Sequence, residues 1–218
     1  YELVFKHYRS VRLVDAQEFK LIKFPRSRFS ASLLEELQKE AARTVHFEGD
    51  DLIIDHVYIE RRMTPLNLYL RSASREDAEK AVIEYGQAIR DLAVTNIFPG
   101  DLLLKNFGVT RHGRVIFYDY DELCLVTDCH FREIPQSQHD EDDMRADAWF
   151  YVGESDVFPE TFINFLGFDP QLKQVFLDAH AEVLTAEWWR GIQERLREGE
   201  LLEVLPYHRH RVRVFSSL

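Results

Sequence analysis

The sequence has few of the residues that build disulfide-stapled or membrane proteins. Cysteine occurs only at Cys124 and Cys129, which is too few for a disulfide framework and leaves a structural zinc site without its second ligand pair. No apolar run approaches the roughly 18 residues that cross a membrane, and the first residues lack the basic-then-apolar order of a signal peptide. We therefore expect a cytoplasmic protein in a reducing environment, with no membrane partner.

Positive charge is also scarce. Lys and Arg number 27 against 38 Asp and Glu, which gives a formal net charge of -11. Proteins that hold a phosphodiester backbone neutralise it with clustered basic side chains, so we expect no nucleic-acid partner. The hydrophobic share of 45% and the aromatic share of 13% exclude a disordered chain. The sequence is therefore expected to form a globular, soluble protein with a sizeable core.

The first sixty residues mix helical and strand patterns. Apolar spacing and turn residues predict a helix over Tyr1–Val14, an edge strand over Phe19–Phe24 that Pro25 ends, a short helix over Ser30–Ala42, and a hairpin of Thr44–Phe47 with Leu52–Ile59. This part is expected to be a small antiparallel sheet with helices.

The later residues are mainly helical around one further hairpin. The pattern predicts a short helix after Pro65, a long helix capped by Ser74 and ending near Val94, a hairpin of Leu102–Val109 with Arg114–Tyr120, an irregular polar segment over Asp128–Asp147, and helices from Pro159 onward, including one over Asp178–Leu196 with Trp188 and Trp189.

Three residues around the second hairpin suggest chemistry. Asp101 lies in the loop after the long helix, Asn106 follows five residues later, and Asp119 leaves the hairpin thirteen residues after Asn106. Each residue alone is a weak signal, because acidic residues commonly form turns. Together the elements would bring three oxygen ligands to one end of a small sheet. Phosphoryl transfer with Mg²⁺ needs this set: one carboxylate for the attacking hydroxyl, and an amide oxygen and a second carboxylate for the metal.

This order and spacing resembles the catalytic loop and metal-binding aspartate of protein kinases. Pro99-Gly100-Asp101 stands where most kinases have His-Arg-Asp, and Asp119-Tyr120-Asp121 stands where most have Asp-Phe-Gly. Without the arginine of His-Arg-Asp, switching through a phosphorylated activation loop is not expected. Asp121 in place of Gly adds a carboxylate that would position water as well as metal.

The sequence is similar, over most of its length, to the bifunctional isocitrate dehydrogenase kinase/phosphatase family of bacteria. The resemblance is carried by Tyr58–Tyr69, by Asn96–Asp101 with Lys105–Arg114, by Phe117–Glu122, and by Asp156–Glu160. It implies an ATP- and Mg²⁺-dependent enzyme, with Mn²⁺ as a possible substitute, that phosphorylates a serine of isocitrate dehydrogenase and removes the phosphate again. It also implies control of flux between the citric acid cycle and the glyoxylate bypass.

The resemblance also implies residue roles. Asp101 would be the catalytic base, Asn106 and Asp119 the Mg²⁺ ligands, and Asp121 a residue of the phosphatase direction. Asp15 matches a second candidate catalytic aspartate of the family; we prefer Asp101, because only Asp101 stands in the loop-plus-hairpin arrangement. The adenine-gripping hinge would fall at Ile59, Glu60, Arg61 and Met63. Glu160 resembles the structural Glu of the kinase Ala-Pro-Glu segment and is expected to pack rather than react.

The expected fold is α+β and bilobal, like that of eukaryotic protein kinases. Residues 1–63 would form part of the nucleotide lobe up to the hinge, and residues 64–218 the helical lobe with the catalytic loop. The sequence has no G-x-G-x-x-G and no phosphate-binding Lys in the matching place. We therefore expect those parts, and a regulatory domain, to lie upstream, and the chain alone to bind ATP poorly.

Two other functions remain open. A pseudokinase-like binding module is favoured by the altered His-Arg-Asp and Asp-Phe-Gly positions, but it gains nothing from clustering carboxylates without a metal. A small-molecule kinase of the aminoglycoside or choline type shares the Asp-x4-Asn pattern and the later Asp, but such enzymes commonly carry a His before the catalytic Asp that is missing here. The size of the phosphorylated acceptor would separate these alternatives.

Overall fold

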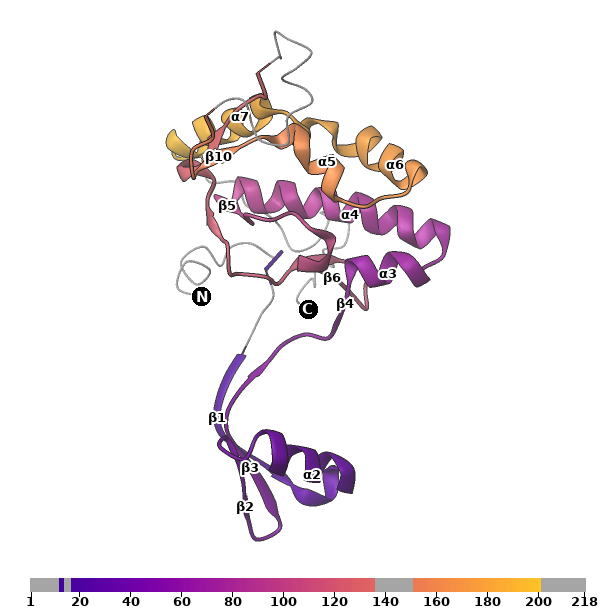
Figure 1. Cartoon of the computed structure of the whole chain (residues 1–218), viewed down its shortest axis with the longest axis vertical. Helices are drawn as coiled ribbons and strands as arrows, with labels where there is room; N and C mark the ends of the chain where they lie inside the picture. Colours follow the sequence, from indigo (N-terminus) through magenta and orange to yellow (C-terminus); the bar gives the residue numbers. More distant parts are fainter. Residues whose placement is uncertain (1–11, 14–16, 136–150, 201–218) are drawn as a thin grey trace, which may run out of the picture. The chain divides into compact units, whose positions relative to one another are not determined.

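The computed structural model describes residues 12–13, 17–135 and 151–200. It divides into two compact units, one of Val14–Arg62 and one of the residues up to Leu13 with those from Met63 on, and each is described by itself (Figure 1). In the described ranges there are six α-helices and four small sheets. The predicted mixture of helices with small antiparallel sheets is confirmed, and the kinase-like arrangement of two lobes stays a prediction. Within those ranges no helix has both the length and the apolar character needed to cross a membrane.

The smaller unit is a three-stranded antiparallel sheet with one helix. Its strands are β1 (Gln17–Pro25), β3 (Asp51–Ile59) and β2 (Val45–Glu48), in the order β1-β3-β2. The predicted edge strand and hairpin are therefore confirmed. The turn between β2 and β3 contains Gly49 at φ +58°, a left-handed conformation that glycine adopts without steric cost. The helix α2 (Ala31–Glu40) begins at Ser30, whose Oγ accepts a hydrogen bond from the Leu33 N–H.

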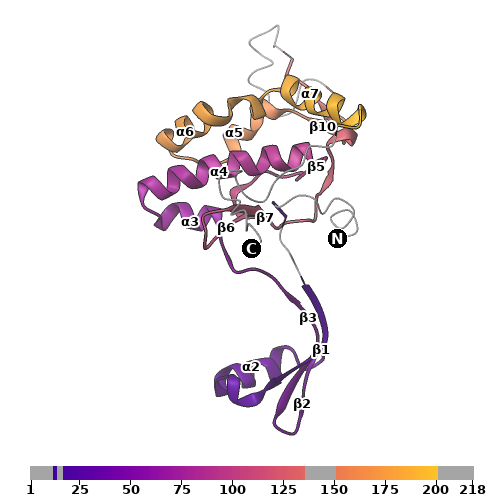
Figure 2. The ribbon, with the colours of Figure 1, turned by 180° about the vertical axis from the view of Figure 1, so that it is seen from behind.

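A long helix, α4 (Arg75–Val94), organises the larger unit. It begins as predicted at Ser74, whose Oγ accepts from the Asp77 N–H at 3.2 Å and donates to the Asp77 carboxylate at 2.8 Å. Its apolar stripe is buried on two sides. Helix α6 (Pro170–His180) covers one side, and the sheet that contains β7 (Val115–Phe117) lies on the other (Figures 1 and 2). The stripe thus forms the centre of the hydrophobic core.

The contact between α4 and α6 is close at one glycine. A Cβ atom at Gly86 would lie 2.1 Å from Cδ2 of His180, a side chain that is buried against α4. The Nε2 atom of His180 lies 2.9 Å from the Ile83 carbonyl oxygen, so the proton belongs on Nε2. Burial lowers the pKa of this imidazole. A neutral histidine therefore fills the space that glycine leaves open.

We expect the substitution Gly86→Ala to lower the free energy of unfolding by about 1–3 kcal/mol, because the added methyl group overpacks a fixed contact. Gly191 of α7 (Ala186–Arg197) is the matched control: a Cβ there meets nothing within 4 Å. Gly191→Ala should raise stability by about 0.5–1 kcal/mol through its better helix propensity. Urea denaturation of both variants measures the difference. Equal effects at the two sites would mean that His180 moves aside freely.

The second predicted hairpin is present, but its strands are shorter than predicted. Strands β6 (Phe107–Thr110) and β7 pair antiparallel, and β4 (Met63–Pro65), which was not predicted, joins the other edge of β6. The prediction of a strand from Leu102 is wrong, because a 3₁₀ turn occupies Leu104–Asn106. Burial alternates along this run, with Leu102 and Leu104 buried and Leu103 and Lys105 less so, and the run therefore imitates a strand with one buried face. The short helix after Pro65 is α3 (Leu66–Ser72).

The C-terminal part is helical, as predicted, but the single helix expected over Asp178–Leu196 is wrong. Helix α6 ends at His180, a 3₁₀ turn follows, and α7 starts anew after Thr185, whose Oγ1 accepts from the Trp188 N–H. A side-chain cap therefore competes with continuation of the helix. Trp189 is buried and stacks on Phe131 with ring centroids 4.8 Å apart. The remaining helix of this part is α5 (Phe162–Phe165).

Short strands connect the rest of the larger unit. Strand β5 (Ile97–Phe98) pairs antiparallel with β8 (Cys124–Leu125), and β9 (His130–Phe131) pairs parallel with β10 (Asp156–Val157). The segment predicted to be irregular therefore contains the short strand β9, and its residues from 136 on lie outside the described ones. Glu160 accepts a hydrogen bond from the Ile134 N–H at 2.6 Å, which agrees with the expected structural role. Most of the helix predicted over Tyr1–Val14 also lies outside the described residues.

Candidate active site

The loop that carries Asp101 follows β5, which is held in place by its pairing with β8. Gly100 has φ +76°, and a Cβ atom there would lie 2.4 Å from the backbone oxygen of Glu122. Only glycine combines this conformation with so close an approach. The antiparallel pairing of Phe98 with Cys124 continues the same contact. The loop of Asp101 is thereby brought against the segment that follows Asp119 and Asp121, residues that are far away in the sequence.

The carboxylate of Asp101 is half-buried and oriented by its own loop. Its Oδ1 atom accepts a hydrogen bond from the Leu103 N–H at 2.8 Å. Below the loop, the buried hydroxyl of Tyr85 in α4 donates to the Leu102 carbonyl oxygen at 2.5 Å. Burial, and then the charge of Asp101, raise the pKa of Tyr85 well above its ordinary value, so the phenol stays a neutral donor. The long helix thus holds the loop and sets the direction of its carboxylate.

Asn106 and Asp119 stand at neighbouring ends of β6 and β7. Asn106 is 5% exposed, and its backbone carbonyl oxygen accepts a hydrogen bond from the Tyr118 N–H at 3.1 Å. The Tyr118 hydroxyl donates to the Lys105 carbonyl oxygen. Burial, followed by the half-buried Asp119, raises the pKa of Tyr118. The hairpin register therefore puts Asn106 beside the residue that precedes Asp119, as the sequence pattern implied.

The remaining predicted site residues are less closely joined to this centre. Asp121 is exposed, and the next residue along the chain is the Glu122 that covers Gly100. Ile59 ends β3 and Glu60 and Arg61 are exposed in the smaller unit, whereas Met63 begins β4 in the larger one. The four hinge residues therefore straddle the boundary between the units.

Asp15 lies outside the described residues. Leu13, two residues before it, forms a parallel β-bridge with Phe117, which is two residues before Asp119. The bridge is supported by a hydrogen bond of 2.7 Å from the Phe117 N–H to the Arg12 carbonyl oxygen. Arg12 and Leu13 thus lie beside β7 at the end that leads into Asp119.

The donor set suits a hard divalent cation. Within the described residues, no three His, Cys, Asp or Glu side chains gather closely enough to hold a metal ion by themselves. An amide oxygen of Asn106 and a carboxylate of Asp119 would therefore need further oxygen ligands from outside the protein. Mg²⁺ is bound in this way, through one or two protein ligands, with water and substrate phosphates completing the octahedron. The oxygen donors of Asn106 and Asp119 are therefore of the kinds that Mg²⁺ takes from proteins.

An ion-pair network that was not predicted from the sequence connects Arg12 to α4 and β7. The guanidinium of Arg12 is 3% exposed and lies 2.6 Å from a carboxylate oxygen of Glu84 and 2.5 Å from one of Asp91, both in α4. It also donates to the Val115 carbonyl oxygen at 3.2 Å. Acidic residues seven apart on a helix share one face, which was the only signal in the sequence. This network joins the N-terminal segment, α4 and β7.

The two cysteines are free thiols, in line with the expected absence of a disulfide framework. Their Sγ atoms lie 3.5 Å apart. The hydrogen bond between them lowers the pKa of Cys124 and, together with burial, raises that of Cys129. Cys129, four residues after the end of β8, is therefore a neutral, buried side chain.

Comparison with known proteins identifies the same family over nearly the whole chain. Residues 1–209 match the family model described as the isocitrate dehydrogenase kinase/phosphatase (AceK) kinase domain. Proteins named isocitrate dehydrogenase kinase/phosphatase are similar: one from Anaeromyxobacter sp. (strain Fw109-5) is 54% identical over 95% of the chain, and one from Yersinia enterocolitica is 47% identical over 96%. The chain spans 36% of the length of both relatives. It therefore belongs to the isocitrate dehydrogenase kinase/phosphatase family and corresponds to the family's kinase domain.

Proposed function

We propose that the chain is the catalytic part of a bifunctional enzyme that uses ATP and Mg²⁺ to phosphorylate a serine of isocitrate dehydrogenase and, in the other direction, hydrolyses the phosphoserine. The proposed cellular role is control of flux between the citric acid cycle and the glyoxylate bypass, in the cytoplasm. Relatives with about half of their matched residues identical carry the name of this activity. The contact of Gly100 with Glu122 is the observation that supports it most strongly, because it brings the loop of Asp101 to the segment after Asp119.

In the phosphorylation step, Asp101 would accept or orient the proton of the serine hydroxyl. The serine oxygen would form a bond to the γ-phosphorus while the bond from that phosphorus to the bridging β-phosphate oxygen breaks, and ADP is the leaving group. Asn106 and Asp119 would hold that ion against the phosphates. The fixed hydrogen bond from the Leu103 N–H to the Asp101 carboxylate supports this role, because orientation of the base requires little further ordering.

In the phosphatase direction water would take the attacking position: its oxygen forms a bond to the phosphorus of the phosphoserine while the bond to the serine oxygen breaks, and the serine hydroxyl and inorganic phosphate are released. Asp121 is the proposed positioning residue for this water, since it is exposed and lies two residues after the metal-binding Asp119. Asp15 is kept as a second candidate for acid–base work in the same site.

We also propose the division into lobes expected from the sequence, with residues 1–63 in the nucleotide lobe and 64–218 in the helical lobe. The backbone of Ile59 to Met63 would grip the adenine of ATP or ADP as the hinge. The compact unit of Val14–Arg62, with its antiparallel sheet, supports this division.

The proposal is tested by phosphoryl transfer from labelled Mg-ATP to isocitrate dehydrogenase, with the full-length protein. Asp119→Asn should lower turnover roughly a hundredfold or more, because it removes the charged metal ligand. Asp178→Asn, on an exposed position of α6, is the matched control and should leave turnover unchanged. Binding of isocitrate dehydrogenase without any phosphoryl transfer by the unaltered protein would favour the binding-module alternative. Transfer only to metabolite-sized alcohols would favour the small-molecule kinase.

A further inference from the structure

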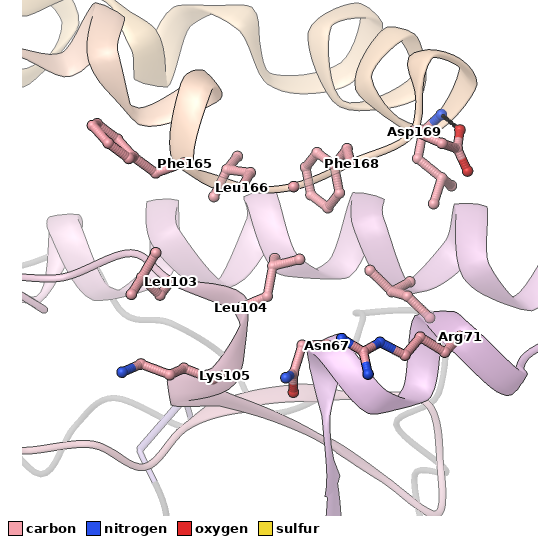
Figure 3. A pocket seen from close by; sticks show the side chains of 12 residues that line it. Asn67, Arg71, Leu103, Leu104, Lys105, Phe165, Leu166, Phe168 and Asp169 are labelled. Carbon is pink, nitrogen blue, oxygen red and sulfur yellow. Dashed lines mark hydrogen bonds between the residues drawn. The ribbon is translucent and has the colours of Figure 1, made fainter.

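A pocket of about 420 Å³ lies beside the candidate active site, entirely within the larger unit. Three segments line it: α3 with Asn67 and Arg71, the loop residues 103–105, and the connection between α5 and α6 around Phe165 and Phe168. Figure 3 shows the phenylalanines on one wall, with Leu166 between them, and Asn67, Arg71 and the loop on the other. Of these residues only Leu103 takes part in the proposed phosphoryl transfer, through the backbone N–H that orients Asp101.

The pocket shares a wall with the catalytic loop. Leu103 and Lys105 line the pocket, and both lie between Asp101 and Asn106 in the sequence. Because consecutive residues span at most about 3.6 Å, the Leu103 backbone is within about 7 Å of that of Asp101. A peptide seated in the pocket therefore reaches Asp101 with only a few residues.

The pocket offers positive charge in a protein that is otherwise strongly acidic. Arg71 and Lys105 are both exposed, and neither forms an ion pair with another residue that the structure describes. The one acidic lining residue, Asp169, is already engaged: it caps α6 and lies 2.9 Å from Arg75. The net charge at this wall thus favours an occupant with a carboxylate.

One further feature selects a peptide over a small anion. Phe165 is 67% exposed at the rim, where an apolar side chain of the occupant would cover it. Figure 3 shows Phe165 on the wall opposite Arg71 and Lys105, so one extended occupant meets both the charges and the ring. A free anion offers no such apolar contact.

We propose that this pocket is the docking subsite for an extended segment of the acceptor protein that carries an acidic side chain next to an apolar one. The carboxylate pairs with Arg71 and Lys105, and the apolar side chain packs on Phe165. The inference rests on the proposed kinase function, to which it adds the means by which the protein substrate is chosen.

The test measures steady-state kinetics and direct binding with the full-length protein, using isocitrate dehydrogenase as the acceptor probe. Arg71→Glu should raise the KM for the acceptor about tenfold, because a charge pair becomes a repulsion, with kcat and the KM for ATP within twofold. Phe165→Ser should raise the same KM without loss of folding, since the ring is mostly exposed. Arg111→Glu, in the exposed turn between β6 and β7, is the charge-matched control and should have no effect.

Calorimetric titration of the acceptor without nucleotide separates this proposal from the proposed function. If Arg71→Glu and Phe165→Ser weaken binding of isocitrate dehydrogenase, the docking site stands even where turnover is absent and the kinase proposal fails. An unchanged acceptor affinity in both variants would overturn the docking site while leaving the kinase proposal intact. Binding of citrate that depends on Arg71, with acceptor affinity unchanged, would also overturn it, in favour of a small-anion pocket.

Discussion

Asp101→Asn is expected to lower kinase turnover by roughly a hundred- to ten-thousand-fold, the usual contribution of a general base. Asparagine can keep the hydrogen bond that Oδ1 accepts from the Leu103 N–H, so the loop keeps its shape. What is lost is the negative charge that, under the proposed function, takes the proton of the attacking hydroxyl. The measurement is initial phosphorylation rate of isocitrate dehydrogenase at saturating Mg-ATP, with the full-length protein.

A comparison with Asp101→Ala separates charge from structure. Alanine loses both the charge and the hydrogen bond, so its turnover should fall as far as that of the asparagine variant while its stability falls further. ATP affinity should be preserved in both, because Asn106 and Asp119 remain. A fall in turnover of less than tenfold for Asp101→Asn would contradict its assignment as the base and would turn attention to Asp15.

Arg12→Met is expected to lower the free energy of unfolding by about 3 kcal/mol, toward the lower end of the range for breaking a buried ion pair. The guanidinium lies between Glu84 and Asp91 with both carboxylates largely shielded from water. Methionine fills much of the space but leaves two buried negative charges. Arg114, 3.3 Å from Glu84, and Gln87, 2.7 Å from Asp91, keep partial partners and limit the loss.

Arg75→Met is the matched control for this prediction. Arg75 also lies near two carboxylates, Glu79 at 3.0 Å and Asp169 at 2.9 Å, but in an exposed setting. Its loss should cost less than about 1 kcal/mol, because solvent already screens the pairs. Urea denaturation with unchanged dependence on denaturant is the measurement. Similar losses for the two arginines would mean that the Arg12 network is not effectively buried.

Added salt distinguishes buried ion pairs from exposed ones. The network around Arg12 should be nearly insensitive to 0.5 M salt, whereas the pair of Arg75 with Asp169 should weaken, since screening acts mainly on exposed charges. The salt dependence of the two substitutions therefore provides an internal check on burial.

Local sequence signals predicted the elements that depend on short-range physics. Ser30 and Ser74 each accept an N–H bond at the first turn of a helix, and these caps can be read from the residue type and the apolar period that follows. The turn at Gly49 likewise reveals the hairpin of the smaller unit. The spacing of Asp101, Asn106 and Asp119 indicated phosphoryl transfer, because the distance along a loop and a hairpin constrains where their ends meet.

Other elements could not be predicted from the apolar pattern, and two of them depend on partners that are distant along the chain. Strand β4 has only three residues and exists because Thr64 pairs with Val109 of β6. The leucines before Asn106 have the pattern of a strand, but they lie in a loop. The Tyr85 hydroxyl holds this loop by donating a hydrogen bond to the Leu102 carbonyl oxygen. The break before α7 arises because Thr185 offers its side chain to the next helix, a local competition that apolar periodicity does not report.

The sequence by itself determined the family, most of the longer elements and the identity of the candidate acid–base and metal-binding residues, since these follow from residue types at fixed spacings. Only the tertiary structure decided that Gly100 lies against Glu122, that Arg12 closes a buried charge network, and that Arg71 and Asn67 face a pocket beside the catalytic loop. Each of these is a contact between residues at least twenty positions apart. The burial that makes such contacts strong is created by packing, which no single segment of the chain encodes.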